Sequence, residues 1–314
     1  METLDVTQIE PRLKHPTIFE KFDGLLGGGA FIIHNDHDPK PLYYQLMAER
    51  GQTFDWEYLV DGPQVWEVKI SKLQTGEKPS TIGELVANDF RKAEVFRKFG
   101  LDFCCGGHKS VQDACVEKGI DVLKVEQALA DVDSGVGTNN QDFNNWELDF
   151  LIDFILNTHH KYVSESIPML YEFTTKVASV HGGSHPEVIE VAQLFRVVAE
   201  ELESHMEKEE VILFPFIKKL VLAKKNDIPY RAPGFGSIKN PINVMEAEHV
   251  SAGDCLKRIN EITDNFTPPD DACSTYKVLY AKLKEFETDL HQHIHLENNV
   301  LFPKAIKIER ELQS

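Results

Sequence analysis

The sequence HMEKEEVILFP at residues 205–215 recurs as HIHLENNVLFP at residues 293–303. Each copy has a histidine, a glutamate four residues later, and the same Leu-Phe-Pro ending. Side chains four residues apart lie on one face of an α-helix, so each copy presents a histidine beside a glutamate. Two further histidines, His160 and His249, precede the copies by 45 and 44 residues. The repeat therefore predicts two tandem helical hairpins, which together make a four-helix bundle.

The helix faces that carry these side chains are otherwise apolar, with Leu202 before the first copy's histidine and Leu290 before the second's. Burying an ionised glutamate costs several kcal/mol unless a positive charge pairs with it. Glu209 and Glu297 would both be buried in this bundle, so we expect a metal to supply the charge. Imidazole and carboxylate ligands in a helical bundle favour a pair of non-haem iron ions over structural zinc, with manganese as an alternative.

Four histidines and two bridging glutamates would give each iron two nitrogen and two oxygen ligands. Coordination positions would stay open for oxygen, nitric oxide or a bridging oxide. The first helix leaves one choice open, because the apolar spacing allows either His159 or His160 to point inward. A single histidine on an apolar face is more often a hydrogen-bonded core residue than a ligand, so a metal-free bundle is the structural alternative. The repeated His-Glu pair favours the metal.

Two stretches rich in turn-forming residues, 74–80 and 133–140, divide the chain. The class we predict is mainly α. The predicted domains are residues 1–76, a small α+β (βαββ) domain; residues 77–135, a small helical domain with a Cys-Cys pair; and residues 136–314, the four-helix bundle.

In the first domain, apolar runs at 30–33, 54–59 and 65–70 predict strands, and helical spacing at 41–47 predicts a helix. A cluster of histidines and aspartates at residues 34–38 follows the first run. We interpret this cluster as a solvated loop, because no helical spacing holds its side chains together as metal ligands.

In the second domain, a capping box at Thr81 and Glu84 begins a predicted helix that runs to Gly100. Ser110 begins a second helix that ends near Gly119. A third predicted helix begins at Asp121, with apolar residues recurring along one face.

The sequence Phe103-Cys104-Cys105-Gly106-Gly107-His108 lies just before the helix that begins at Ser110. Adjacent Cα atoms are about 3.8 Å apart, closer than the roughly 4.4 Å that an unstrained disulfide needs, so we expect free thiols. A helix N-terminus and basic neighbours should lower the thiol pKa values and make Cys104 and Cys105 reactive or metal-ligating. Small packing residues are the alternative interpretation.

The composition excludes several classes of protein. The 314 residues carry 33 Lys and Arg against 51 Asp and Glu, for a net charge of −18, which disfavours nucleic acid as a partner. No apolar run reaches the roughly 18 residues of a membrane span, and the charged first residues do not resemble a secretory signal. Five cysteines, an odd number, are typical of reduced thiols in a cytoplasmic protein.

Residues 79–312 resemble the iron-sulfur cluster repair di-iron proteins, which join a small Cys-Cys domain to a hemerythrin-like bundle. The matches are Phe103-Cys104-Cys105-Gly106-Gly107, the two repeat copies, and Glu246-Ala247-Glu248-His249. One departure is Val163, where family members often have a second histidine. Residues 10–72 look like a small domain of unknown function that is found beside hemerythrin-like proteins.

The resemblance implies two non-haem irons, oxo- and carboxylate-bridged, and favours His160 over His159. The implied ligands are His160, His205, His249 and His293, with Glu209 and Glu297 bridging, and Glu248 as a neighbour of the site. The implied activity is repair of clusters damaged by nitric oxide or peroxide, by donating iron to the damaged proteins.

In this hypothesis Cys104 and Cys105 transfer iron or sulfide to the damaged protein, and whether this amounts to catalytic turnover is left open. The rival functions are a hemerythrin-like sensor or carrier of oxygen or nitric oxide and a di-iron nitric oxide reductase, neither of which needs the thiols. The oligomeric state is also left open, with a homodimer as one option.

Overall fold

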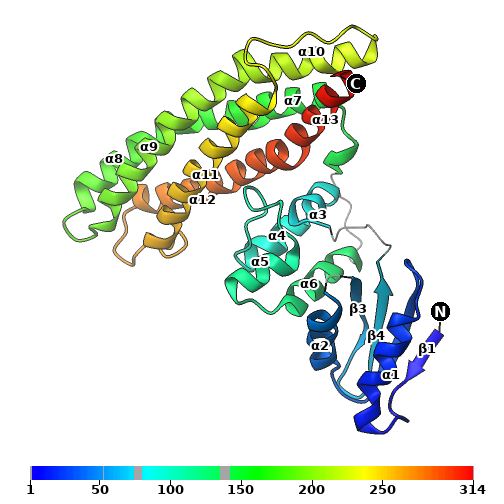
Figure 1. Cartoon of the computed structure of the whole chain (residues 1–314). Coiled ribbons are helices and arrows are strands. Elements are labelled where there is room, and N and C mark those ends of the chain that lie inside the picture. Colours follow the sequence, from blue (N-terminus) through cyan, green and yellow to red (C-terminus); the bar gives the residue numbers. More distant parts are fainter. Residues whose placement is uncertain (1, 52, 74–79, 135–141, 314) are drawn as a thin grey trace. The chain divides into compact units, whose positions relative to one another are not determined.

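The computed structural model describes residues 2–51, 53–73, 80–134 and 142–313 and falls into two compact units (Figure 1). The N-terminal unit is made of residues 1–81, 91–101 and 110–139. The bundle unit is made of residues 82–90, 102–109 and 140–314. The two units therefore interleave along the chain between residues 82 and 139.

The N-terminal unit contains a four-stranded sheet with strand order β1-β2-β4-β3 (Figure 1). Strands β1 and β2 are parallel and the other neighbours are antiparallel. Aromatic side chains join both helices to the sheet: Phe22 of α1 contacts Phe54 of β3, and Tyr43 of α2 contacts Trp56 of β3. The elements are β1 (Glu2–Asp5), α1 (Pro11–Asp23), β2 (Ala30–Asn35), α2 (Lys40–Arg50), β3 (Phe54–Asp61) and β4 (Trp66–Lys72).

The α+β character of this domain is confirmed, and the predicted βαββ unit is β2-α2-β3-β4. The sequence analysis missed the two elements before it, β1 and α1. Strand β1 is short and largely exposed, so its residues carry no alternation of apolar and polar side chains. Helix α1 has Pro16 in its interior, a residue that usually argues against a helix.

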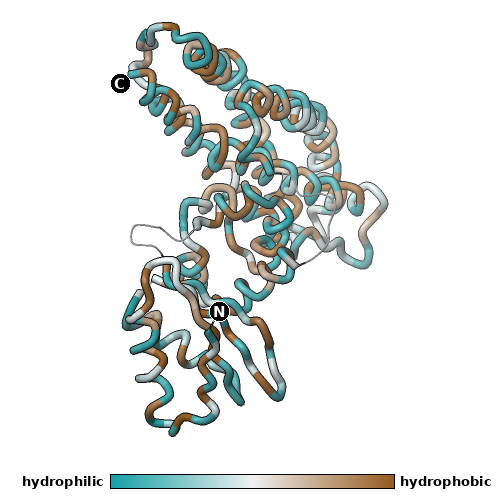
Figure 2. Tube along the Cα trace, turned by 90° about the vertical axis from the view of Figure 1, so that its right-hand side faces the viewer, coloured by the Kyte–Doolittle hydropathy of each residue, from teal (hydrophilic) through white to brown (hydrophobic). Residues whose placement is uncertain are grey.

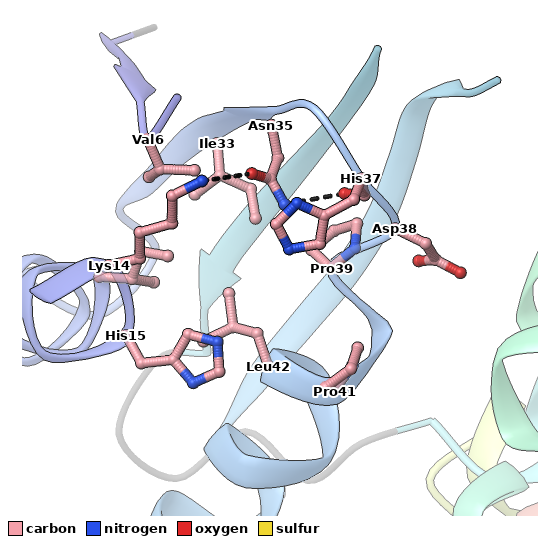
Figure 3. Close-up of a pocket in the computed structure, with 11 residues that line it drawn as sticks. Val6, Lys14, His15, Ile33, Asn35, His37, Asp38, Pro39, Pro41 and Leu42 are labelled. Carbon is pink, nitrogen blue, oxygen red and sulfur yellow. Dashed lines mark hydrogen bonds between the residues drawn. The ribbon is translucent and has the colours of Figure 1, made fainter. Parts of the chain in front are cut away.

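The histidines and aspartates of residues 34–38 form separate pairwise contacts. The predicted loop is wrong for His34, which lies within β2 opposite Glu67 of β4, whereas residues 36–38 follow the strand. His34 Nδ1 lies 2.9 Å from Glu67 Oε1, and His37 Nδ1 lies 2.6 Å from Asp36 Oδ1. His37 also borders a small pocket, and Figure 3 shows Lys14 and His15 of α1 on another side of this pocket.

The prediction of a single helix from Thr81 to Gly100 is wrong, because the chain forms two helices there, α3 (Ile82–Asn88) and α4 (Lys92–Lys98). The break at residues 89–91 occurs where the chain passes from the bundle unit to the N-terminal unit. The next two predicted helices are confirmed as α5 (Val111–Lys118) and α6 (Val122–Ser134). Ser110 Oγ accepts a hydrogen bond from Asp113 N and caps α5.

Helix α6 carries a carboxyl that should make the N-terminal unit sensitive to pH. Burial, with help from Asp55 and Asp121, raises the pKa of Glu126 from its ordinary 4.5 to about 8. The folded state therefore holds a proton that the unfolded state releases, and stability should fall as the pH rises from about 4.5 to about 8. We expect Glu126→Gln to remove this loss and to stabilise the unit at pH 8 by a few kcal/mol, at about 1.4 kcal/mol per pKa unit.

Calorimetric unfolding midpoints at pH 5 and pH 8 test the Glu126 prediction. The variant should gain most at pH 8 and little at pH 5. If the unfolding midpoints of the wild type and of Glu126→Gln change equally between pH 5 and pH 8, Glu126 is not the cause of the pH dependence.

Most of the bundle unit consists of long helices. A short 3-10 turn, η1 (Phe143–Asn145), precedes the first of them. Figure 2 shows hydrophobic residues recurring between hydrophilic ones along these helices, and the large side chains of Phe195 and Phe286 are fully buried between them. Among the described residues, none of the helices is both long enough and apolar enough to cross a membrane. The helices are α7 (Leu148–Ile155), α8 (Lys161–His181), α9 (Glu187–Lys208), α10 (Phe214–Lys225), α11 (Lys239–Ile262), α12 (Ser274–Leu296) and α13 (Phe302–Gln313).

Three of the long helices contain one π-helical turn each, so that α7 continues into α8, α9 into α10 and α12 into α13. Wider π-turns occur frequently at functional sites. Pro215 and Pro303 follow two of the turns and lack the N–H that an ordinary α-helical bond would use. The turns are η2 (Leu156–His160), η3 (Glu209–Leu213) and η4 (Glu297–Leu301).

Candidate metal centre

Six side chains from the four long helices meet in the core of the bundle unit, and all six are buried. They form two overlapping sets of donors, and the donor atoms within each set all lie within 4.8 Å of one another. Both sets contain the same two glutamates, whereas each has its own pair of histidines. The sets are His160, Glu209, His293 and Glu297, and His205, Glu209, His249 and Glu297.

Each glutamate lies between histidines from different helices. Glu209 Oε2 is 3.4 Å from His160 Nε2 and 3.3 Å from His205 Nε2. Glu297 Oε1 is 3.1 Å from His293 Nε2, and its Oε2 is 3.1 Å from His249 Nε2. The structure therefore brings together all six residues that the sequence indicated, with both carboxylates shared by the two sets.

The outer nitrogens of three histidines bond to oxygen atoms, which turns each Nε2 toward the carboxylates. His205 Nδ1 is 2.9 Å from Glu248 Oε2, so Glu248 does neighbour the site. His160 Nδ1 is 2.8 Å from Glu210 Oε1, and His249 Nδ1 is 2.9 Å from Asn298 Oδ1. The sequence analysis missed these last two acceptors, although each directly follows a bridging glutamate in the two repeat copies.

The carboxylates dominate the electrostatics of the site. Burial by itself would lower the pKa of His160, but Glu209 and Glu297 raise it to about 10. The pKa of His205 is raised to about 9, again against the effect of burial. Burial opposes ionisation of Glu297, yet its histidine neighbours hold its pKa well below the ordinary value. The site therefore favours positive charge between the two glutamates.

Several buried polar atoms at this place have no hydrogen-bond partner among the described residues. They are His160 Nε2, both carboxylate oxygens of Glu209, Glu297 Oε2 and His293 Nδ1. Buried polar atoms are rarely left unsatisfied, because each costs about 1–3 kcal/mol. A cation within each set would satisfy most of them, so these residues fit a metal that prefers nitrogen and oxygen ligands.

The ambiguity in the first helix is resolved in favour of His160. His159 is buried too, but its Nδ1 lies 2.9 Å from Asp289 Oδ1. Its ring stacks on that of His293, with centroids 5.6 Å apart and an angle of 6° between the planes. His159 therefore supports the position of a donor histidine from outside the two sets.

The cysteine loop packs on the bundle next to this centre, and residues 102–109 belong to the same unit. Asn299 Nδ2 donates to Phe103 O at 3.2 Å and to Cys104 O at 3.0 Å. His295 is fully buried, with Nδ1 3.3 Å from Phe103 O. Consecutive residues of η4 thus contribute a bridging glutamate, a bond to His249 and the anchor of the cysteine loop.

The lowered thiol pKa that we expected is wrong for Cys104. The hydrogen bond to Cys105, then burial and the nearby Asp102, raise the pKa of Cys104 well above the ordinary value. The five cysteines are free thiols.

Comparison with known proteins supports the interpretation of these six residues as a cation-binding site. The model of the hemerythrin HHE cation binding domain matches residues 151–305, which contain all six donors. The chain is 40% identical over 226 residues to the iron-sulfur cluster repair protein YtfE of Enterobacter sp. (strain 638), covering 72% of this chain and 96% of that protein. The chain belongs to the iron-sulfur cluster repair family.

Other members of the iron-sulfur cluster repair family match over similar lengths. The protein of the same name from Musicola paradisiaca is 37% identical, over 74% of this chain and 98% of its own length. The protein from Escherichia coli O17:K52:H18 is 38% identical, over 72% of this chain and 96% of its own length.

Two further family models match the rest of the chain. A domain of unknown function, DUF542, matches residues 78–133, and an uncharacterized conserved protein, DUF2249, matches residues 3–72. The sequence resemblance is therefore confirmed, including the N-terminal domain of unknown function.

In this family member the outer hydrogen bonds should tune metal affinity. We expect Glu248→Gln to weaken iron binding by about 10- to 100-fold, because the amide no longer supplies a charged acceptor to His205 Nδ1. Competition with an iron chelator measures the change. Lys208→Met is the control: Lys208 also contacts Glu248 but none of the six donors in the two sets. If both variants bind iron like the wild type, Glu248 does not support the site.

Proposed function

We propose that this chain repairs damaged iron-sulfur clusters and that a di-iron centre in the bundle is the source of iron. The observation that carries the proposal is the pair of donor sets sharing Glu209 and Glu297. Two ions sharing two carboxylates would have two histidines each, and helical bundles build di-iron sites from glutamates and histidines of facing helices. The relatives are iron-sulfur cluster repair proteins by name, which supports repair as the activity.

Neighbouring residues hold the donor histidines in place and orient them. Glu210, Glu248 and Asn298 accept hydrogen bonds from three histidines, which keeps each Nε2 directed toward the shared carboxylates. The surrounding apolar side chains keep water out. Bound irons with open coordination positions would supply reversible binding of nitric oxide or oxygen and a store of iron for donation.

Cys104 and Cys105 are the residues we propose to transfer iron or sulfide to the damaged protein. Cys105 is half-buried, so it is accessible to a partner, and the loop lies on the same helix that provides Glu297. The partners would be proteins with damaged clusters. Thiol transfer requires reduced cysteines and therefore suits a reducing compartment such as the cytoplasm.

Reactivation of a client enzyme tests this function. The iron-loaded protein is incubated without oxygen with an enzyme whose cluster has been damaged by nitric oxide, and recovered activity is followed. The wild type should restore activity and Glu209→Leu should not, because the variant loses a carboxylate common to both donor sets.

A carrier or sensor of oxygen or nitric oxide would give a different result in this assay. It would bind the gas reversibly and leave the client inactive. Failure of the fully loaded wild type to restore activity would therefore refute the repair function.

A further inference from the structure

We propose that Asp102, Cys104 and Cys105 form a second metal site for one thiophilic divalent cation of the Fe²⁺, Zn²⁺ and Co²⁺ class. This site is separate from the six-residue centre and shares no donor with it. The proposal rests on the geometry of the cysteine loop and does not require the repair activity.

The three donor atoms are already spaced like the ligands of one metal ion. Cys104 Sγ is 4.0 Å from Cys105 Sγ and 3.1 Å from Asp102 Oδ1, and one donor atom from each of the three lies within 4.8 Å of the others. With metal–sulfur bonds of about 2.3 Å and metal–oxygen bonds of about 2.0 Å, tetrahedral geometry needs about 3.8 Å between sulfurs and about 3.5 Å between sulfur and oxygen. The two distances from Cys104 Sγ therefore differ from those of a tetrahedral site by only a few tenths of an ångström.

The loop holds this arrangement before any metal binds. Asp102 Oδ1 accepts hydrogen bonds from Cys104 N at 2.9 Å and from Cys105 N at 3.0 Å, which fixes the carboxylate beside both thiols. The two glycines that follow allow the tight turn. A Cβ on Gly106 would lie 2.8 Å from Asp102 O, and one on Gly107 would lie 2.3 Å from Asn299 Oδ1.

The three donor residues range from buried to exposed, which would let a bound ion exchange with solvent. Cys104 is buried, Cys105 is half-buried and Asp102 is exposed, so a cation can reach the site from solvent. Three protein donors leave the fourth tetrahedral position for water or for a thiol of another protein. Residue 253 of the neighbouring helix α11 is a glycine, and even an added Cβ there would lie 3.9 Å from Cys105 Sγ.

The donor set also selects the metal. Two thiolates favour thiophilic ions over Mg²⁺ and Ca²⁺, which prefer all-oxygen sites. Binding of one divalent cation converts both thiols to thiolates and releases two protons to solvent. The ion then balances two of the three negative charges at the site.

Cobalt titration tests this site in the full-length protein. The chain is reduced with a phosphine, kept free of oxygen and titrated with Co²⁺, whose thiolate complexes show charge-transfer absorption in the near ultraviolet. We expect this absorption to saturate at one equivalent in Glu297→Leu, which keeps the cysteine loop but lacks a carboxylate of both other donor sets. In the wild type it should reach the same amplitude by three equivalents, because the six-residue centre can also take Co²⁺. Cys104→Ser and Cys105→Ser should each lose most of the absorption.

Asp102→Asn is the decisive variant, because the amide keeps an oxygen acceptor for the two N–H groups but removes the charged ligand. Its Co²⁺ affinity should fall by about tenfold or more with an unchanged circular dichroism spectrum. Cys255→Ser, which changes another half-buried thiol, should bind like the wild type.

Two results would overturn the second site. One is the absence of thiolate absorption at one equivalent of Co²⁺ in Glu297→Leu, and the other is an unchanged affinity in Asp102→Asn. Iron analysis of the same samples keeps the two sites apart, since failure of the second site leaves iron binding at the six-residue centre intact.

Discussion

Replacing Glu297 with leucine should reduce the bound iron from two ions per chain to almost none. Glu297 belongs to both donor sets and lies within 4.0 Å of His160, His249 and His293. Loss of one histidine would weaken one ion, whereas loss of this carboxylate removes a ligand from both. Elemental analysis after anaerobic reconstitution measures the change.

The fold should survive Glu297→Leu, because removing a buried charge together with its counter-ion can leave stability nearly unchanged. Circular dichroism checks this. The matched control is Glu309→Gln, which changes another buried carboxylate of the same unit, one that bonds Tyr230, Ser237 and Ile238. The control should keep both irons. Iron at the wild-type level in a folded Glu297→Leu protein would refute the bridging role.

The double substitution Cys104→Ser/Cys105→Ser should abolish reactivation of a damaged client enzyme while the protein keeps its iron. The hydroxyls are poor metal ligands and poor nucleophiles at neutral pH, so neither iron nor sulfide can pass through them. The reactivation assay and iron analysis are made on the same preparation.

Cys273→Ser controls for the loss of a thiol, because Cys273 is exposed and its sulfur is near His181, away from the cysteine loop. It should reactivate the client like the wild type. Equal reactivation by the double variant would remove the thiols from the proposed function without affecting the iron centre.

The six donors could be predicted because the information is local and repeated. Two copies of one motif place a histidine and a glutamate on each of two helices, and helical geometry turns both inward. Because the helix face around them is apolar, the glutamates were expected to be buried, and a metal was the expected source of the compensating positive charge. The choice between His159 and His160 needed the resemblance, because both histidines fit the apolar periodicity and both are in fact buried.

Other features depend on contacts between distant parts of the chain. The π-turns arise in three helices whose sequences follow ordinary helical periodicity, so spacing alone could not reveal them. The bond from Asn299 to the cysteine loop spans almost 200 residues. The raised pKa of Cys104 follows from its hydrogen bond with Cys105 and from burial, neither of which was indicated by its position before a helix. Strand β1 is defined by its pairing with β2 rather than by its own residues.

The central claim is that one bridged pair of iron ions occupies the core of the bundle. Low-temperature Mössbauer spectroscopy of the oxidised protein, reconstituted with isotopically enriched iron, tests it most directly. We expect two irons per chain in a single diamagnetic signal, because bridging ligands couple the two spins. A signal from isolated paramagnetic iron, or well under two ions per chain, would contradict the account.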